Sequence, residues 1–239
     1  MVYVGSKARL AKYLVPIIQE YIKKYKIENY IEPFVGGANI IDKIKCKNKC
    51  GYDLHNGLID IYNAIQLNWN PPLEITEEDY INAKNNKILE PLKSYIGFNG
   101  SYASKYFGGF ARGYKSDGIT SRDIYNERTR NFFKQIPNLQ YIKFEVKDFI
   151  NIDVTNTLIY CDPPYENTTK YSTKKFNHKI FWNWVRIMEK RNNIILISEF
   201  NAPYDFISIW SKERVSSLDK NTGNKKNIEN LFILKKEGL

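Results

Sequence analysis

The chain has 239 residues, of which 43% are hydrophobic and 26% charged, and its formal net charge is +10. This composition can fill a hydrophobic core, which excludes a mostly disordered chain, and no run reaches the ~18 consecutive apolar residues of a membrane span. We expect no secretory signal, since the first residues lack an apolar stretch and a cleavage site. Three scattered cysteines and two isolated histidines predict neither a disulfide framework nor a metal site.

The first part of the chain alternates between helical and strand patterns. Apolar residues at helical spacing predict an amphipathic helix over residues 8–26. Short apolar runs predict strands at 29–34 and 49–54, each followed by a helix, at 38–44 and 58–67. This alternation is typical of a doubly wound parallel sheet.

The pattern changes after Pro71 and Pro72. From residue 80 to 137 the apolar periodicity fades, and between residues 84 and 134 ten basic residues stand against four acidic ones, which is +6 of the net +10. We therefore predict that residues 71–137 form an inserted, partly irregular subdomain. Residues 1–70 and 138–239 would then build one α/β domain around it. A basic segment rich in aromatic residues favours a nucleic acid as partner.

Strand patterns resume after the insertion. Short apolar runs at 140–145, 157–161 and 193–198 predict strands that are buried on both faces, and residues 232–234 predict an edge strand. Residues 182–189 predict the intervening helix, with Trp182 and Trp184 in its core-facing side.

Asp162, Pro163, Pro164 and Tyr165 directly follow the strand predicted at 157–161. The carboxyl ends of parallel strands are where doubly wound sheets place their ligands. Consecutive prolines leave a rigid carbonyl acceptor, so an acid, a fixed carbonyl and an aromatic ring stand together. Such a set suits a flipped-out base with an exocyclic amine, because the ring stacks on the base and the oxygens accept the amine's two hydrogens. These acceptors become stronger as positive charge develops on the nitrogen.

A second motif, Glu32 to Ala38, follows the first predicted strand and contains Gly36 and Gly37. Small residues at such a turn let a ligand approach the backbone. Asp53 stands 19 residues after Phe34, at the end of the next predicted strand, where an acid can bind ribose hydroxyls. The chain contains neither GxGxxG nor a Walker-type GxxxxGK[ST] sequence, which favours an adenosine-bearing ligand other than NAD or ATP.

Taken together, Val4-Gly5-Ser6-Lys7, the segment from Glu32 to Gly37, Asp53 and the Asp-Pro-Pro-Tyr sequence resemble the DNA adenine-N6 methyltransferases of the Dam type. The order of cofactor motifs, basic insertion and Asp-Pro-Pro-Tyr is that of the alpha class, and the insertion looks like a phage-type branch. Where the family has Trp-Ala-Gly-Gly-Lys, residues 3–7 read Tyr-Val-Gly-Ser-Lys. The resemblance implies a Rossmann-like methyltransferase sheet with an inserted target-recognition subdomain.

The same resemblance assigns roles to individual residues. It implies that Asp162, Pro163, Pro164 and Tyr165 are catalytic. It implies that S-adenosylmethionine is held by Tyr3, Gly5, Ser6, Lys7, Glu32, Phe34, Gly36, Gly37, Asp53, Asp148, Phe149 and Asp162. Residues 198–201 would line the base pocket. DNA would be contacted by Asn99, Tyr102, Lys105, Arg112, Lys115, Arg122 and Arg128 in the insertion, and by Lys170 after the catalytic motif.

The implied function is site-specific methylation of adenine N6 in double-stranded DNA, by a monomer in the cytoplasm of a bacterial or phage-infected cell, without membrane contact. A cognate restriction endonuclease is a further expected kind of partner. The alternatives are the same chemistry on cytosine N4, RNA adenine or a glutamine amide, and a non-catalytic DNA-binding module. Asp instead of Asn at position 162 favours DNA adenine over RNA adenine or glutamine. Cys161 lacks the Pro-Cys context of a cytosine-C5 nucleophile.

Overall fold

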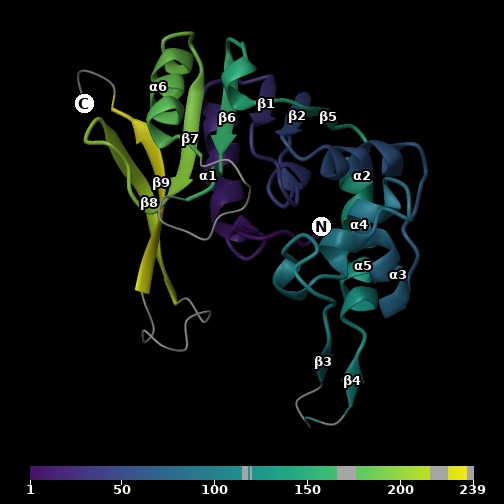
Figure 1. The fold of residues 1–239 in the computed structure, drawn as a ribbon. Coiled ribbons are helices and arrows are strands. Elements are labelled where there is room, and N and C mark those ends of the chain that lie inside the picture. The colour runs from purple at the N-terminus through teal and green to yellow at the C-terminus, as the bar shows by residue number, and fades with distance from the viewer. Residues whose placement is uncertain (115–117, 119, 166–175, 216–225, 236–239) are drawn as a thin grey trace.

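A computed structural model describes residues 1–114, 118, 120–165, 176–215 and 226–235. Its main sheet has seven strands in the order β5-β2-β1-β6-β7-β9-β8 (Figure 1). The parallel strands are β1 (Asn29–Glu32), β2 (Asn48–Asp53), β5 (Lys143–Val146), β6 (Thr157–Cys161) and β7 (Ile194–Glu199). The antiparallel strands β8 (Phe206–Val215) and β9 (Lys226–Leu234) extend the sheet beyond β7. The prediction of a doubly wound, mostly parallel sheet is confirmed.

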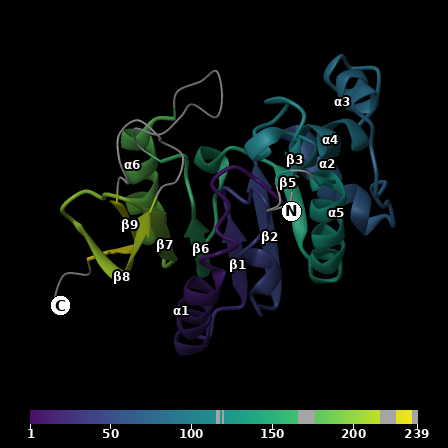
Figure 2. The ribbon, with the colours of Figure 1, turned by 90° about the horizontal axis from the view of Figure 1, so that it is seen from below.

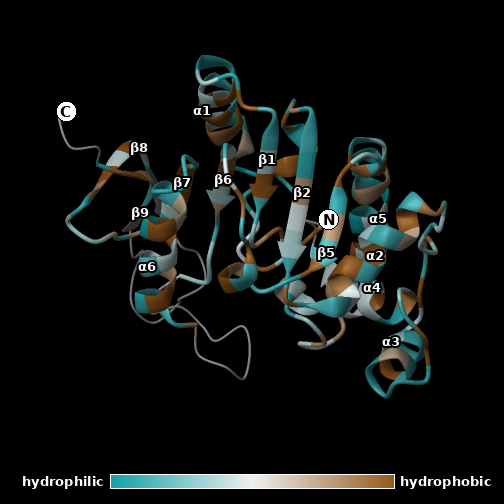
Figure 3. Ribbon diagram, turned by 90° about the horizontal axis from the view of Figure 1, so that it is seen from above, coloured by the Kyte–Doolittle hydropathy of each residue, from teal (hydrophilic) through white to brown (hydrophobic). Residues whose placement is uncertain are grey.

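Helices cover both faces of this sheet. Helices α1 (Ala11–Lys24) and α6 (His178–Glu189) lie on opposite sides of the strands (Figures 2 and 3). Leu14 and Ile18 of α1 share one hydrophobic core with residues of α2 (Asn56–Gln66). Phe181 and Trp184 of α6 belong to the second core on the other face. Strand β6 lies between the two cores and every one of its residues is buried, as its continuous apolar sequence predicts.

Two predicted elements turned out differently. The helix predicted at 38–44 is reduced to a short 3-10 turn, η1 (Ile41–Lys43), because the backbone at Ala38 has a φ of 54°, outside the helical region. The strand predicted at 232–234 is the end of the nine-residue β9, and it is not at the edge, because β9 pairs with both β7 and the ten-residue edge strand β8. Polar and apolar residues mix along this hairpin, so its strands lack the continuous apolar signal of β6 and β7.

The insertion contains more regular structure than its sequence predicts. It holds α3 (Glu77–Lys84), α4 (Leu92–Asn99), α5 (Ile124–Gln135), the 3-10 turn η2 (Tyr102–Ser104) and the small hairpin of β3 (Gly113–Tyr114) and β4 (Ser121–Arg122). A capping box between Thr76 and Asp79 starts α3. The helices enclose buried aromatic residues, chiefly Tyr80, Tyr95, Tyr125 and Phe132. The aromatic residues that fill this core do not recur at a clear helical spacing in the sequence. This explains why the sequence predicts a partly irregular segment.

The insertion is continuous with the sheet domain. Its buried residues belong to the same core as those of α1 and α2. After α5 the chain passes through η3 (Ile136–Leu139) into β5, and η4 (Phe149–Asn151) follows β5. The β3–β4 hairpin projects on the same side as the carboxyl ends of β6 and β7 (Figure 1). Among the described residues, no helix has both the length and the apolar character needed to cross a bilayer.

Candidate active site

The strand order places the two sequence motifs side by side. Strand β1 pairs with β2 on one side and with β6 on the other, so the chain winds outward in both directions from the β1–β6 pair. Ligands of doubly wound sheets bind outside the carboxyl ends of the strands at such a switch point. The Glu32–Gly37 turn leaves β1 and the Asp162–Tyr165 segment leaves β6 at this location.

The glycine turn is crossed by the amino-terminal segment. Gly36 has a φ of +45°, and a Cβ added there would come within 3.0 Å of the Tyr3 ring. A Cβ on Gly37 would lie 2.5 Å from the Met1 carbonyl oxygen. The α-amino group of Met1 donates to the Gly37 carbonyl at 2.9 Å. These glycines therefore leave room for residues 1–3, a role that the sequence does not reveal. Lys7, four residues further on, reaches the segment that follows β6.

Asp53 joins β2 to this turn. Its two carboxylate oxygens accept hydrogen bonds from the backbone N–H of Gly36 at 3.1 Å and of His55 at 3.0 Å. Burial raises the pKa of Asp53, and these backbone donors act in the opposite direction. Each carboxylate oxygen has a further lone pair, so the group can still accept from a ribose hydroxyl. His55 caps α2 by accepting from the Leu58 N–H.

Asp162 is paired with a buried lysine. The Lys7 Nζ lies 2.7 Å from Asp162 Oδ1, and the lysine side chain is 4% exposed whereas that of Asp162 is 20% exposed. Burial raises the pKa of Asp162, while the Lys7 charge and the Tyr165 hydroxyl lower it. The ion pair thus holds a carboxylate acceptor at the carboxyl end of β6, in reach of solvent on one side.

Tyr165 lies against this ion pair. Lys7 Nζ is 4.5 Å from the centroid of its ring, and the Phe200 ring meets it edge-on at a centroid distance of 4.6 Å. The Tyr165 hydroxyl donates to Oε1 of Glu229, a buried residue of β9 that also lies 3.5 Å from Lys7 Nζ. Burial raises the pKa of Tyr165 well above its ordinary value, so its hydroxyl stays protonated and donates. Phe200 lies in the segment expected to line the base pocket, whereas Glu229 was not anticipated.

The remaining expected cofactor residues have structural partners. Glu32 is buried and accepts from the Tyr30 hydroxyl at 2.7 Å. The Ser6 hydroxyl accepts from the Asn39 amide at 2.9 Å, and Gly5 is exposed with a φ of 77°. Asp148 caps η4, and Phe149 is buried against the Phe34 ring at a centroid distance of 5.5 Å. Their contact with a cofactor stays a prediction.

Two of the expected DNA contacts require correction. Asn99 is fully buried in α4 and does not present its amide to a base. Arg128 is half-buried and donates to the backbone carbonyls of Asn99 at 2.7 Å and Ser101 at 2.8 Å. Arg128 therefore supports the end of α4 from within the insertion. A sequence cannot distinguish this arginine from a surface one, because its partners are backbone atoms 27 and 29 residues away.

The other insertion residues stay exposed. Tyr102 and Lys105 face solvent, while Arg112 pairs with Glu77 and Arg122 with Glu127 in exposed ion pairs. Exposed pairs of this kind contribute little to stability and can exchange a carboxylate for a phosphate. Lys115 and Lys170 lie outside the described residues.

Aromatic rings connect the insertion to the segments around the glycine turn. Phe98 of α4 contacts Tyr3 at a centroid distance of 5.5 Å and His55 at 5.0 Å. Tyr106 contacts both His55, at 4.6 Å, and Phe98, at 4.7 Å. Phe98 and His55 were not predicted as site residues, since an isolated ring carries no signal of its partner.

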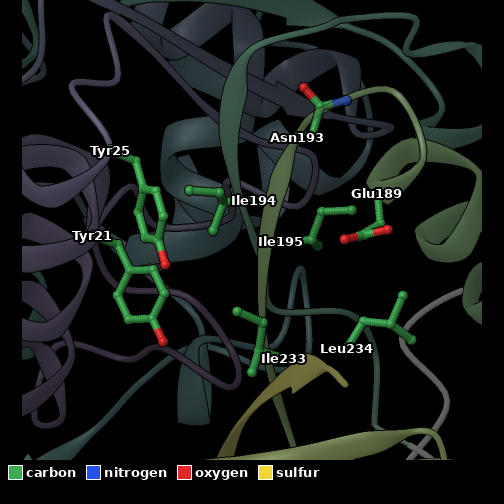
Figure 4. A pocket seen from close by; sticks show the side chains of 8 residues that line it. All are labelled: Tyr21, Tyr25, Glu189, Asn193, Ile194, Ile195, Ile233 and Leu234. Atoms are coloured by element: carbon green, nitrogen blue, oxygen red, sulfur yellow. The ribbon is translucent and has the colours of Figure 1, made fainter. Parts of the chain in front are cut away.

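Other cavities lie away from these groups. The cavity drawn in Figure 4 has a volume of about 20 Å³ and lies between α1, α6, β7 and β9, where Tyr21 and Tyr25 face Ile194 and Ile233. It has room for about one water molecule and lies at the amino end of β7, not the carboxyl end. In the described part of the chain, no group of three or more His, Cys, Asp or Glu side chains is arranged to hold a metal ion.

The sheet, the acid at the end of β2 and the Asp-Pro-Pro-Tyr segment at the switch point are arranged as in doubly wound α/β proteins that bind a ligand at the carboxyl ends of their strands. Residues 3–192 match the model of the family described as D12 class N6 adenine-specific DNA methyltransferase. The chain belongs to this family. The family description names methyl transfer to adenine N6 in DNA, which agrees with the family that the motifs resemble.

The chain is also similar to individual proteins. The chain is 24% identical over 193 residues to the modification methylase StsI of Streptococcus sanguinis. The matching region covers 70% of this chain but only 28% of that protein. Among solved structures, the rRNA methyltransferase aviRa of Streptomyces viridochromogenes has a TM-score of 0.45 at 10% identity, covering 95% of this chain and 84% of that chain. A Pyrococcus horikoshii protein described as an RNA methyltransferase has a TM-score of 0.42 at 8% identity, covering 93% and 83%.

Proposed function

We propose that this chain transfers a methyl group from S-adenosylmethionine to N6 of an adenine flipped out of double-stranded DNA. The observation that carries the proposal is the pair of Lys7 and Asp162, 2.7 Å apart beside the Tyr165 ring at the carboxyl end of β6. This pair supplies an oriented acceptor and a stacking surface at the point where the glycine turn and Asp53 approach.

The residues present fit S-adenosylmethionine. Asp53 has spare acceptor capacity for a ribose, and the buried ring of Phe149 lies beside Phe34, next to the turn that leaves β1. We assign cofactor binding to Tyr3, Gly5, Ser6, Lys7, Glu32, Phe34, Gly36, Gly37, Asp53, Asp148, Phe149 and Asp162. When bound, S-adenosylmethionine supplies an electrophilic methyl group on a positively charged sulfur.

The chain's own residues act on the target base. The Tyr165 ring stacks on the flipped adenine, as aromatic side chains do with unpaired bases. Asp162 accepts one hydrogen of the amine and the Pro163 carbonyl accepts the other, which favours a tetrahedral nitrogen with a localised lone pair. Lys7 keeps Asp162 ionised and fixed in direction. Because positive charge develops on the nitrogen, the Asp162 carboxylate stabilises the transition state more than the ground state.

We assign recognition of DNA to the exposed basic residues of the insertion. Tyr102, Lys105, Arg112 and Arg122 are exposed, and the β3–β4 hairpin extends on the side of the carboxyl ends of β6 and β7 (Figure 1). Arginine can pair with guanine edges and lysine with phosphates. As an enzyme of DNA, the protein would work in the cytoplasm of a bacterial or phage-infected cell, and a cognate restriction endonuclease would be its partner where methylation protects a site.

One experiment tests the base and the sequence together. The purified chain is incubated with labelled S-adenosylmethionine and DNA that lacks methylated bases, and single-molecule sequencing then locates the modification. N6-methyladenine at one recurring sequence supports the proposal. Methylated cytosine N4, or label found only in RNA or protein, would assign the same chemistry to another amine. Binding of DNA without transfer of label would indicate a non-catalytic module.

A further inference from the structure

The buried carboxylate of Glu229 lies at the centre of the proposed site, although it is far from every motif in the sequence. Its side chain is fully buried, its Oε1 accepts from the Tyr165 hydroxyl, and Lys7 Nζ lies 3.5 Å away. Glu229 belongs to β9, beyond residues 3–192 that match the family model. The carboxy-terminal hairpin therefore reaches the catalytic segment through this one side chain.

Two consecutive residues of β9 support both aromatic rings of the base pocket. Glu229 accepts from Tyr165, and the Asn230 amide donates to the Phe200 carbonyl at 3.0 Å. The Phe200 ring in turn meets Tyr165 at 81°, nearly perpendicular. The direction of the Tyr165 ring is thus set from its hydroxyl end by β9 and from its side by Phe200.

Glu229 also changes the charge of the site. Lys7 lies between Asp162, at 2.7 Å, and Glu229, at 3.5 Å, so one ammonium is shared by two carboxylates. A site with an excess of negative charge favours a transition state in which positive charge develops on the target nitrogen. A hydrophobic or amide residue at position 229 would leave Lys7 to neutralise Asp162 alone.

We infer that Glu229 is a positioning residue for methyl transfer, which orients Tyr165 through its hydroxyl and shares Lys7 with Asp162. The inference rests on the proposed function, since it assigns Glu229 a part in that reaction. It also distinguishes two contributions of Tyr165: the ring stacks on the base, and the hydroxyl fixes the direction of the ring.

The effect of Glu229 on Asp162 can be measured in the acid limb of the pH–rate profile. Asp162 must be ionised to accept, so the rate falls as the pH decreases through its pKa. The Glu229 charge raises the pKa of Asp162, so its removal should move the acid limb to lower pH. A purely structural role for Glu229 would leave the limb in place. The charged or titratable groups that influence Asp162 come from the amino-terminal segment, β1, β6, the segment after β6 and β9: Lys7, Glu32, Tyr160, Cys161, Tyr165 and Glu229.

The experiment compares Glu229→Gln, Tyr165→Phe and their double variant in single-turnover methylation of a duplex containing the site found by sequencing. Glu213→Gln, an exposed change on the neighbouring strand β8, is the matched control. We expect each single variant of the pair to lose roughly tenfold or more in rate, the scale of one charge-assisted hydrogen bond, with the DNA dissociation constant unchanged within about twofold. The double variant should be no more than about twofold slower than the slower single variant, because both changes break the same contact.

The outcomes separate the inference from the proposed function. If the wild-type chain methylates no adenine, the proposed function fails. If the wild type is active and Glu229→Gln matches Glu213→Gln in rate and in acid limb, the positioning role of Glu229 is wrong. Rate losses that multiply in the double variant would also overturn it. If circular dichroism shows that Glu229→Gln does not fold, Tyr165→Phe still tests the inference. An unchanged rate in that variant would show that the hydrogen bond from the Tyr165 hydroxyl to Glu229 does not contribute to methyl transfer.

Discussion

Asp162 combines two properties that are usually separate, a raised pKa from burial and an ion pair that keeps it charged. A carboxylate in this state is a strong acceptor whose direction does not depend on solvent. Asp53 at the end of β2 is similar, since it is half-buried and accepts hydrogen bonds from two backbone N–H groups.

Asp162→Asn should lose roughly 10²–10³-fold in single-turnover rate, the range for a lost electrostatic stabiliser. The change keeps the shape but substitutes a neutral amide for the acceptor that Lys7 holds. Binding of S-adenosylmethionine should change much less than the rate. Asp60→Asn, an exposed change on α2, is the control and should keep the wild-type rate. Methylation by Asp162→Asn at a near wild-type rate would make the proposed mechanism wrong.

Asp53→Ala should weaken binding of S-adenosylmethionine by about 1.5–3 kcal/mol, the cost of lost charge-assisted hydrogen bonds. The structure adds a second cause, because the Gly36 N–H loses its partner when the carboxylate is removed. Isothermal titration calorimetry measures the affinity, with Asp60→Ala as the control. An unchanged affinity would remove Asp53 from the cofactor site.

At the scale of elements, the predicted insertion consists of helices and a small hairpin, and its basic residues divide into two kinds. Arg128 is turned inward onto backbone carbonyls, whereas Lys105, Arg112 and Arg122 are exposed. The basic composition alone suggests one role for all of them. The two kinds should differ in stability and in salt dependence.

Arg128→Ala should lower the free energy of unfolding by about 1.5–3 kcal/mol, because it removes two hydrogen bonds from a charged, half-buried donor. Arg130→Ala, two residues further along α5 and exposed, should change stability by no more than about 0.5 kcal/mol. Urea denaturation of both variants measures the difference. Equal stabilities would show that Arg128 does not support the end of α4.

Lys105→Ala should reduce the dependence of DNA affinity on salt by about 0.9 log units per log unit of salt, the value for one lost phosphate contact. Lys23→Ala is the control. Lys23 lies in the last turn of α1, which leads into the amino end of β1, so its replacement should leave the slope unchanged. Fluorescence anisotropy over a salt series gives both slopes. If the two variants have the same slope as the wild type, Lys105 does not contact phosphate.

At the scale of the whole molecule, the core contains an acid whose protonation is linked to folding. Glu32 is buried at the end of β1, and burial raises its pKa well above the ordinary value. The folded protein therefore retains a proton that the unfolded chain releases above about pH 4.3. Stability from this group is present at low pH and is lost as the pH rises toward the folded-state pKa.

Glu32→Gln should flatten the pH dependence of unfolding by about 1.4 kcal/mol per pH unit across the window in which only the unfolded chain is ionised at this position. The wild type should lose stability over this window relative to the variant. Urea denaturation at a series of pH values from 5 upward measures the two curves. Glu28→Gln, an exposed change just before β1, should run parallel to the wild type. A Glu32→Gln curve that is also parallel would contradict the linkage.

The sequence by itself determined the fold class, and it determined that the glycine turn and the Asp-Pro-Pro-Tyr segment lie at the same edge of the sheet. Strand β6 is continuously apolar because it is buried on both faces, and the Asp-Pro-Pro-Tyr segment and the glycine turn each directly follow a strand. In a parallel sheet, residues that follow neighbouring strands meet at one edge. Local patterns of this kind are written within a few consecutive residues, so a sequence shows them.

The tertiary structure alone decided which polar and aromatic residues join the site. Glu229 reaches Tyr165 from a strand 64 residues away, and Asn99 is buried rather than exposed. Phe98 likewise connects the insertion to His55 and to Tyr3, which lies against the glycine turn. The burial and the partners of a side chain depend on long-range packing. Neither composition nor hydrophobic periodicity predicts which distant residue will contact it. Only the folded chain can show that Lys7 stands between two carboxylates.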